Sequence, residues 1–317
     1  MRMQPSANGG WRRTNGGWRA WMAMLAAVVM ALGCVAPGLS AAAGPSQGWP
    51  PYLKAFKPPA GRTWEQYRVR ATDGMPQALI PAGEFDMGAA DNDKDARADE
   101  KPRTKVSVGD FWMDMHTVTI AQYTKFVQDS GYDAGPEWRQ WAKDVAQGVP
   151  GLSGLVPAVY VSYADAMAYA KWAGASLPTE AQWEKAARGG KDGLRFPWGD
   201  DANAQGANGD WDGKRALSYG DAMADTLPVC RRLANGFGLY DMAGNVWQWC
   251  RDGYSPTWYK DQPAPAKDPE DTAVTDLHVL RGGSWICVAR DLRVSGRLHC
   301  APGYRNNFFG FRCASAP

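Results

Sequence analysis

The stretch from Arg281 to Arg312 reads RGGSWICVARDLRVSGRLHCAPGYRNNFFGFR. It concentrates polar, aromatic and sulfur side chains on a backbone that glycine interrupts several times. Gly282 and Gly283 permit positive φ or a close approach of another backbone segment. We therefore expect Ser284 and Cys287 to lie on a tightly turned segment that faces a pocket. A thiol in such a position is buried filling, half of a disulfide, a metal ligand or a nucleophile.

The composition of the whole chain favours a loop-rich globular protein. Its 317 residues include 36 Gly, 22 Pro and 16 Trp, which implies many turns and many bulky rings. Lys and Arg total 35 against 33 Asp and Glu, so no net charge recruits nucleic acid or anionic lipid. We expect a monomer without a nucleic-acid partner, which recognises a peptide or small-molecule substrate by shape in a pocket.

Residues 1–43 are typical of a secretory signal peptide. Arginines precede an apolar run from Trp21 to Leu32, and small residues follow it up to Ala43. The run is shorter than the ~20 apolar residues that span a bilayer as a helix. We expect cleavage near Ala43, export to the periplasm or medium, and no membrane span. Two variants stay open, because Arg12-Arg13 weakly resembles a twin-arginine signal and Cys34 lies in a sequence similar to a lipoprotein cleavage site.

The rest of the chain divides into a linker and one domain. Residues 44–78 are rich in Pro, Gly and aromatic residues without periodicity, which predicts a linker or an arm on the domain surface. The domain then runs over 79–317. Within it, residues 79–88 predict a strand, a turn and a strand, and residues 106–115 predict one half-buried strand. The charged segment 90–105 between them predicts a solvated loop.

Three helices are predicted by the same pattern at their N-termini. A hydroxyl side chain at the N-cap is followed three residues later by a side-chain acceptor, as in a capping box. The pairs are Thr119 with Gln122, Ser162 with Asp165, and Thr179 with Gln182. Each helix is expected to end at a glycine that can adopt the left-handed conformation, namely Gly131, Gly174 and Gly189.

Five motifs, in the same order along the chain, resemble the formylglycine-generating enzyme (sulfatase-modifying factor) family. They are SLPTEAQWE from Ser176, FPWG from Phe196, NGFGLYDMAGNVWQW from Asn235, RGGSW from Arg281 and GFR from Gly310. The resemblance runs from about residue 79 to residue 313. It implies an irregular, loop-rich α+β fold related to C-type lectins, with little regular secondary structure.

The resemblance also implies chemistry for the RGGSW segment. In formylglycine-generating enzymes two cysteines bind copper(I) and use oxygen to oxidise a substrate cysteine, and Cys287 falls on the first of these. The second position, five residues on, is Leu292. One thiolate and a leucine do not make the two-thiolate site that copper(I) prefers, so we do not expect copper bound in that way. Ser284 and Trp247 match the family's pocket.

Three interpretations of this altered site stay open. The chain is an exported oxidase relative with an altered metal centre, which uses Cys287 with His299 or an outside cofactor on a peptide or peptide-derived substrate. The family's pyoverdine-maturation branch, which serves oxidation of a peptide siderophore, resembles this case. Alternatively the chain is a non-catalytic lectin-like binding module, or Cys287 is only structural. A true formylglycine-generating oxidase acting on sulfatases is a further alternative.

The resemblance implies two calcium sites as well. The first takes side-chain oxygens from Asp241 and Gln248 and backbone carbonyls from Gly244 and Val246. The family has Asn and Glu where this chain has Asp and Gln, so the number of carboxylates is unchanged, and calcium accepts six to eight oxygens in a flexible geometry. The alternative is a polar turn with Asx hydrogen bonds. The second site takes Asn208, Gly209, Asp221 and Met223.

Counting the cysteines predicts at least one free thiol. If Cys34 leaves with the signal peptide or is acylated, five cysteines remain, and five cannot all pair within one chain. Because Cys287 falls on the family's catalytic position, we expect it to be the free one. An oxidising compartment favours two bridges among the other four, with the pairing left open: Cys230, Cys250, Cys300 and Cys313.

Overall fold

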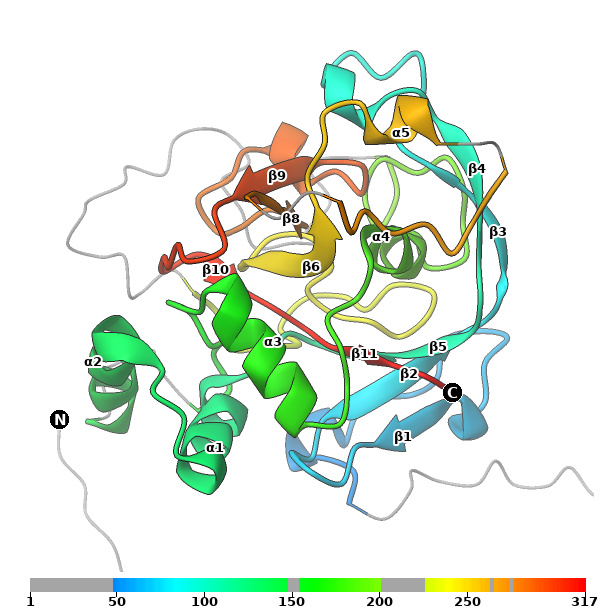
Figure 1. Cartoon of the computed structure of the whole chain (residues 1–317). Helices are drawn as coiled ribbons and strands as arrows, with labels where there is room; N and C mark the ends of the chain where they lie inside the picture. The colour runs from blue at the N-terminus through cyan, green and yellow to red at the C-terminus, as the bar shows by residue number, and fades with distance from the viewer. Residues whose placement is uncertain (1–47, 148–153, 201–225, 263–264, 274–275) are drawn as a thin grey trace, which may run out of the picture. The chain divides into compact units, whose positions relative to one another are not determined.

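The strands are short because turns interrupt the chain often, and they form three small sheets (Figure 1). The computed structural model describes residues 48–147, 154–200, 226–262, 265–273 and 276–317. The predicted signal peptide and Cys34 lie outside these residues. The first sheet is antiparallel and has the order β1-β2-β5-β11. Its strands are β1 (Tyr67–Val69), β2 (Pro76–Ile80), β5 (Phe111–Asp114) and β11 (Ala314–Ser315).

The other two sheets mix parallel and antiparallel neighbours. The order β3-β4-β7 joins β3 (Gly83–Met87), β4 (Thr104–Val108) and β7 (Ala266–Lys267). The order β10-β6-β8-β9 joins β10 (Phe309–Gly310), β6 (Trp247–Gly253), β8 (His278–Arg281) and β9 (Arg297–Cys300). This last sheet positions the site, because the RGGSW motif begins at the end of β8 and Trp247 begins β6.

The strand that we predicted over 106–115 is wrong as a single element. It is two strands, β4 and β5, that belong to different sheets. Gly109 and Asp110 are exposed between them, and the Gly109 amide donates a hydrogen bond to the Asp268 carboxylate at 2.8 Å. The buried apolar positions shift from 106 and 108 to 111 and 113 across this break, so the period-2 pattern changes phase there, which the prediction of one strand overlooked. The predicted strand, turn and strand over 79–88 correspond to β2 and β3.

All three predicted capping boxes are present. Thr119, Ser162 and Thr179 each accept a hydrogen bond from the amide three residues on, and the side chain of that residue accepts from the cap's own amide. Gly131, Gly174 and Gly189 have φ of 68°, 70° and 62°, as predicted for helix ends. The α-helices are α1 (Ile120–Ser130), α2 (Gly135–Ala146), α3 (Tyr163–Trp172), α4 (Glu180–Arg188) and α5 (Trp258–Asp261). The 3-10 helices are η1 (Pro51–Leu53), η2 (Trp64–Gln66), η3 (Ala98–Glu100) and η4 (Ala289–Leu292).

Helices α1, α2 and α3 lie side by side (Figure 1). Their contacts are aromatic: Tyr123 lies 5.1 Å from Trp138 and 5.8 Å from Tyr169 between ring centroids, and Phe126 lies 5.5 Å from Tyr169. The aromatic residues of α1 and α3 therefore serve packing. Among the described residues, no helix is long and apolar enough to cross a membrane.

The segment before residue 79 contributes to the core. Leu53, Phe56 and Tyr67 are buried in the main apolar cluster. The Tyr52 hydroxyl and the His116 Nε2 atom, which is buried, lie 2.8 Å apart. The described part of this segment is therefore packed structure and not the linker that we expected, and the boundary near residue 79 falls within β2.

A network of buried ion pairs connects α4 to the two strands of the site sheet. Glu180 accepts from Arg281 Nη1 at 2.9 Å and from Arg297 Nε at 2.7 Å. Glu184 accepts from Arg188 Nη2 at 2.5 Å and from Arg281 Nη2. The side chains of Glu180, Glu184, Arg281 and Arg297 are at most 1% exposed. Arg281, the residue that begins RGGSW, is therefore a buried cation with a structural role.

The charged segment 90–105 is also less solvated than we predicted. Glu100 is fully buried and accepts from both terminal nitrogens of Arg293, at 2.6 and 2.8 Å. Its carboxylate also accepts from the Ser295 hydroxyl at 2.8 Å. The segment therefore packs on residues that follow RGGSW, and part of its charge is paired inside the protein.

Candidate functional site

The RGGSW turn requires both of its glycines. Gly282 and Gly283 have φ of 97° and 72°, in the region that favours glycine. A Cβ on Gly283 would lie 2.5 Å from Leu292 Cδ2, and one on Gly282 would lie 3.0 Å from Trp183. The turn therefore approaches its neighbours as closely as the sequence predicts, and it presents Ser284 and Cys287 beyond β8.

Two backbone hydrogen bonds join this turn to the turn before β6. The Gly244 amide donates to the Gly282 carbonyl at 2.8 Å, and the Trp285 amide donates to the Asn245 carbonyl at 3.0 Å. Asn245 has a positive φ of 67°, which asparagine tolerates better than most residues. The pairing of the two turns brings Trp247 to the RGGSW segment.

Cys287 lies at the centre of this arrangement. Its side chain is 9% exposed, and its Sγ atom lies 3.4 Å from the buried Ser284 hydroxyl. Burial raises the pKa of the Cys287 thiol, hydrogen bonds from Ser284 and Trp247 lower it, and the charge of Asp291 raises it. The net shift is upward, so the resting residue is a neutral thiol and not an activated thiolate. Three of the four predicted catalytic residues, Ser284, Trp247 and Cys287, thus lie together.

The fourth, His299, lies elsewhere. It is an exposed residue of β9, and its ring stacks on Tyr254 with 3.8 Å between centroids. Burial lowers the pKa of His299, Asp99 raises it and Arg297 lowers it. These neighbours belong to the surroundings of the buried ion pairs and not to those of Cys287. The predicted pairing of Cys287 with His299 is therefore not present in the structure.

By the resemblance, Leu292 stands at the position of the family's second catalytic cysteine. Leu292 is fully buried at the end of η4 and packs in the same apolar cluster as Cys287. Among the described residues, no group of three or more His, Cys, Asp or Glu side chains could hold a metal ion. The polar groups that contact the Cys287 thiol are the Ser284 hydroxyl and the Trp247 indole.

The two expected disulfides are not seen among the described residues. All five described cysteines are free thiols. Burial raises the pKa of Cys230, Cys250 and Cys313 well above the usual value, and each is also raised by a different carboxylate. These carboxylates are Asp241, Glu180 and Asp114, respectively. The three cysteines therefore lie beside different carboxylates. The number of cysteines in the sequence does not reveal this.

The expected first calcium site does not have the arrangement that calcium needs. The Gln248 Oε1 atom accepts from Trp183 Nε1 at 2.8 Å and from Arg312 Nε at 2.7 Å. One carboxylate oxygen of Asp241 accepts from the Cys230 amide at 2.9 Å. A guanidinium thus lies against a predicted ligand, and the residues as arranged do not fit the ion. The four residues of the second expected site lie outside the described residues: Asn208, Gly209, Asp221 and Met223.

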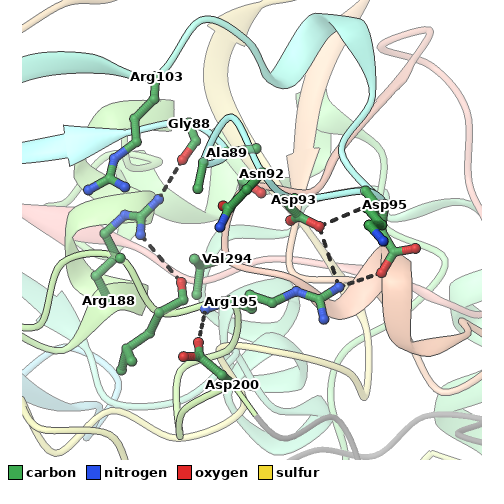
Figure 2. Close-up of a pocket in the computed structure, with 15 residues that line it drawn as sticks. Gly88, Ala89, Asn92, Asp93, Asp95, Arg103, Arg188, Arg195, Asp200 and Val294 are labelled. Atoms are coloured by element: carbon green, nitrogen blue, oxygen red, sulfur yellow. Dashed lines mark hydrogen bonds and ion pairs between the residues drawn. The ribbon is translucent and has the colours of Figure 1, made fainter.

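The structure also contains a charged cavity that the sequence did not indicate (Figure 2). It has a volume of about 540 Å³ and is lined by residues from the 88–103 and 188–200 regions and by Val294 and Ser295. Arg195 pairs there with Asp95, and Arg188 donates to the Gly88 carbonyl at 2.9 Å. Cys287 is not part of this lining. Among the charged residues of the lining, Arg195 pairs with Asp93 and Asp95, whereas Arg103 and Arg188 pair with Asp86 and Glu184 outside it.

Residues 65–317 match the model of the family described as sulfatase-modifying factor enzyme 1-like domain. The chain belongs to this family. The sulfatase-modifying factor family match begins at residue 65, which agrees with the packing of β1 into the core. The predicted family and its irregular α+β fold are confirmed.

Several relatives show the range of this sulfatase-modifying factor family. The formylglycine-generating enzyme of Thermomonospora curvata is 34% identical over 280 residues, covering 75% of this chain and 92% of that protein. The inactive C-alpha-formylglycine-generating enzyme 2 of Mus musculus is 31% identical over 320 residues, covering 86% and 97%. The structure of PvdO from Pseudomonas aeruginosa superposes with a TM-score of 0.64 at 25% identity, covering 83% of this chain and all of that one. The family thus includes enzymes and a member named as inactive.

Proposed function

We propose that this chain is an exported member of the family that takes part in the oxidative maturation of a peptide or peptide-derived substrate. The observation that carries the proposal is the cluster of Ser284, Cys287 and Trp247 beside a buried Leu292. By the family resemblance these three residues match positions of the oxidase site, and Leu292 stands where that resemblance places the second thiol. The structural similarity to PvdO, which covers the whole of that chain, supports the same proposed function.

The proposed reaction removes two electrons and two protons from the substrate. Dioxygen is the co-substrate that accepts them and becomes hydrogen peroxide, so the overall reaction is balanced without any further reductant or oxidant. Cys287, as a neutral thiol next to the Ser284 hydroxyl, binds the reacting part of the substrate or an outside cofactor. Trp247, which is 4% exposed, supplies an apolar wall that excludes water.

The test is oxygen uptake with a panel of linear peptides and reduced peptide siderophores, with and without added copper. We expect uptake together with a substrate mass lower by two hydrogens, and loss of both in Cys287→Ser. The matched control is Cys300→Ser, which removes a partly exposed thiol on β9. Oxidation that is unchanged in Cys287→Ser would refute the assignment of this thiol.

A non-catalytic binding module is the second candidate, and the relative named as inactive supports it. The same panel distinguishes the two functions. Saturable binding of a peptide without oxygen uptake, weakened by Trp247→Ala, would favour the module over the oxidase.

Export can be tested separately on the secreted form. The basic, apolar and Ala-rich order of residues 1–43 predicts a mature N-terminus near Gly44. N-terminal sequencing after expression in a secreting host measures it directly. An acylated Cys34 would instead identify a lipoprotein, and an intact Met1 would contradict export.

A sulfatase peptide containing CxPxR is expected not to be converted to formylglycine at the rate of a true family enzyme. One thiol cannot supply the two-thiolate site for copper(I), and Leu292 offers no ligand. Mass spectrometry of the peptide after incubation with copper measures aldehyde formation, with the Thermomonospora curvata enzyme assayed in parallel. Aldehyde formation by this chain at a comparable, copper-dependent rate would overturn the expectation.

A further inference from the structure

The orientation of the Gln248 side-chain amide is fixed by three partners. Its oxygen faces two N–H groups, from Trp183 and Arg312, and neither donor can accept in exchange. Its NH₂ group therefore points the other way and donates to the Asp241 carbonyl at 2.8 Å. Gln248 is fully buried, so no water competes for these bonds. Both lone pairs of the amide oxygen are used, which leaves none for an ion.

Arg312 supplies the positive charge at the same turn. Its Nη2 atom donates to the carbonyls of Tyr240 at 2.7 Å and Asp241 at 3.0 Å, and its Nη1 atom donates to the Asp114 carbonyl at 3.0 Å. Arg312 is fully buried. A divalent cation added next to this guanidinium would meet a like charge at low dielectric, where repulsion is strong.

We propose that Gln248 and Arg312 take the place of a metal ion in the 241–248 turn, so that this turn does not depend on calcium. The amide N–H group and the guanidinium bind the carbonyls of residues 240 and 241, which are the kind of oxygen that a cation would bind. The choice of glutamine is essential to this arrangement. A glutamate at position 248 could still accept from Trp183 and Arg312, but its second oxygen would face the Asp241 carbonyl.

This arrangement predicts that one substitution creates a need for calcium. In Gln248→Glu, two oxygens face each other near 2.8 Å unless a cation or proton lies between them. We expect Gln248→Glu to melt at a lower temperature than the wild type in chelator and to recover when calcium is added. The 241–248 turn of the wild type needs no ion, so we expect the wild type to melt at the same temperature in both solutions, apart from any response that comes from the second expected site.

The matched control is Gln182→Glu, which makes the same chemical change in the capping box of α4. Glutamate is as suitable as glutamine at that position of a capping box, so neither stability nor calcium response should change. Thermal melts of the full chain in calcium chloride and in EDTA measure all three proteins. The same melts on Asp221→Ala separate any calcium response that comes from the second expected site.

The outcomes are distinct. Recovery by calcium in Gln248→Glu alone supports the proposal. A wild-type response that disappears in Asp221→Ala also supports it, since the ion then acts at the other site. A calcium-induced rise of roughly 5 °C or more in both the wild type and Asp221→Ala would overturn it. A Gln248→Glu protein that is as stable as the wild type in EDTA would overturn it as well.

Discussion

Arg281→Ala is expected to lower the free energy of unfolding by about 3 to 5 kcal/mol, because it leaves buried carboxylates without their partner. Arg281 is fully buried and donates to both Glu180 and Glu184, which are also buried. Its side chain further donates to the Val294 carbonyl at 2.6 Å, so the backbone after η4 would lose a partner too. A loss of this size is a large part of the 5 to 15 kcal/mol that stabilises a typical domain. Urea unfolding followed by tryptophan fluorescence measures it.

The matched control is Arg139→Ala. Arg139 is half exposed and pairs with the exposed Asp133, so its loss should change the free energy of unfolding far less than the loss of Arg281. If both variants lose stability to the same small extent, the buried network does not contribute as proposed. If Arg281→Ala does not accumulate in folded form, Arg281→Lys provides a second measurement. Lysine keeps the positive charge but lacks the several planar N–H donors of the guanidinium group.

The second large effect is a fall in stability as the pH rises from about 4 to about 8. Burial and, to a smaller extent, the charge of Glu180 outweigh the amide hydrogen bonds from Glu180 and Asp271, and together these groups raise the pKa of Asp252 to about 8. Those bonds measure 2.7 and 3.1 Å. The unfolded chain releases this proton near pH 3.9. The folded state therefore binds more protons throughout this range.

The sign of the effect follows from that difference in bound protons. The contribution of Asp252 is complete below about pH 4 and is lost as the pH rises through 8. The slope for one such group is at most about 1.4 kcal/mol per pH unit. Asp252→Asn stays neutral at every pH, so its stability should depend less on pH over this range. Urea midpoints at pH 5, 6, 7 and 8 test this.

Asp261→Asn is the control for this pH series. Asp261 is exposed at the end of α5, so its substitution should leave the wild-type pH dependence unchanged. Groups that shift in the opposite direction, such as Glu184, whose pKa is lowered by Arg188 and Arg281 despite its burial, are present in all three proteins. They cancel in the comparison. Parallel curves for the wild type and Asp252→Asn would contradict the prediction.

The helices show how far the sequence alone predicts this fold. The three capped helices have a local signal at each end, and each is found where it was predicted. Helix α2 was missed because its N-cap, Ala134, makes no side-chain hydrogen bond. Its stability comes from Trp138 and Trp141, which are buried against other elements. That contribution is tertiary, and local patterns do not contain it.

The site shows the corresponding limit for function. Motif positions placed Ser284, Trp247 and Cys287 together, because a family motif fixes backbone geometry. They did not predict that Gln248 turns its oxygen toward Arg312, which comes from a segment 64 residues away. They also did not predict that Glu100 is buried by Arg293, 193 residues further along the chain. Which atom faces which partner depends on contacts between distant segments.

The last strand of the first sheet has a consequence for biosynthesis. β11 pairs with β5, Ser315 accepts from Arg68 at 2.8 Å, and the Cys313 amide donates to Asp114 at 2.9 Å. The sheet therefore joins segments about 200 residues apart, and it cannot close until residues 313–315 have been synthesised. Until then β5 presents an unpaired edge, the kind of surface on which chains aggregate. If the chain is exported before it folds, as the proposal of export allows, this sheet closes only after residues 313–315 have also crossed the membrane.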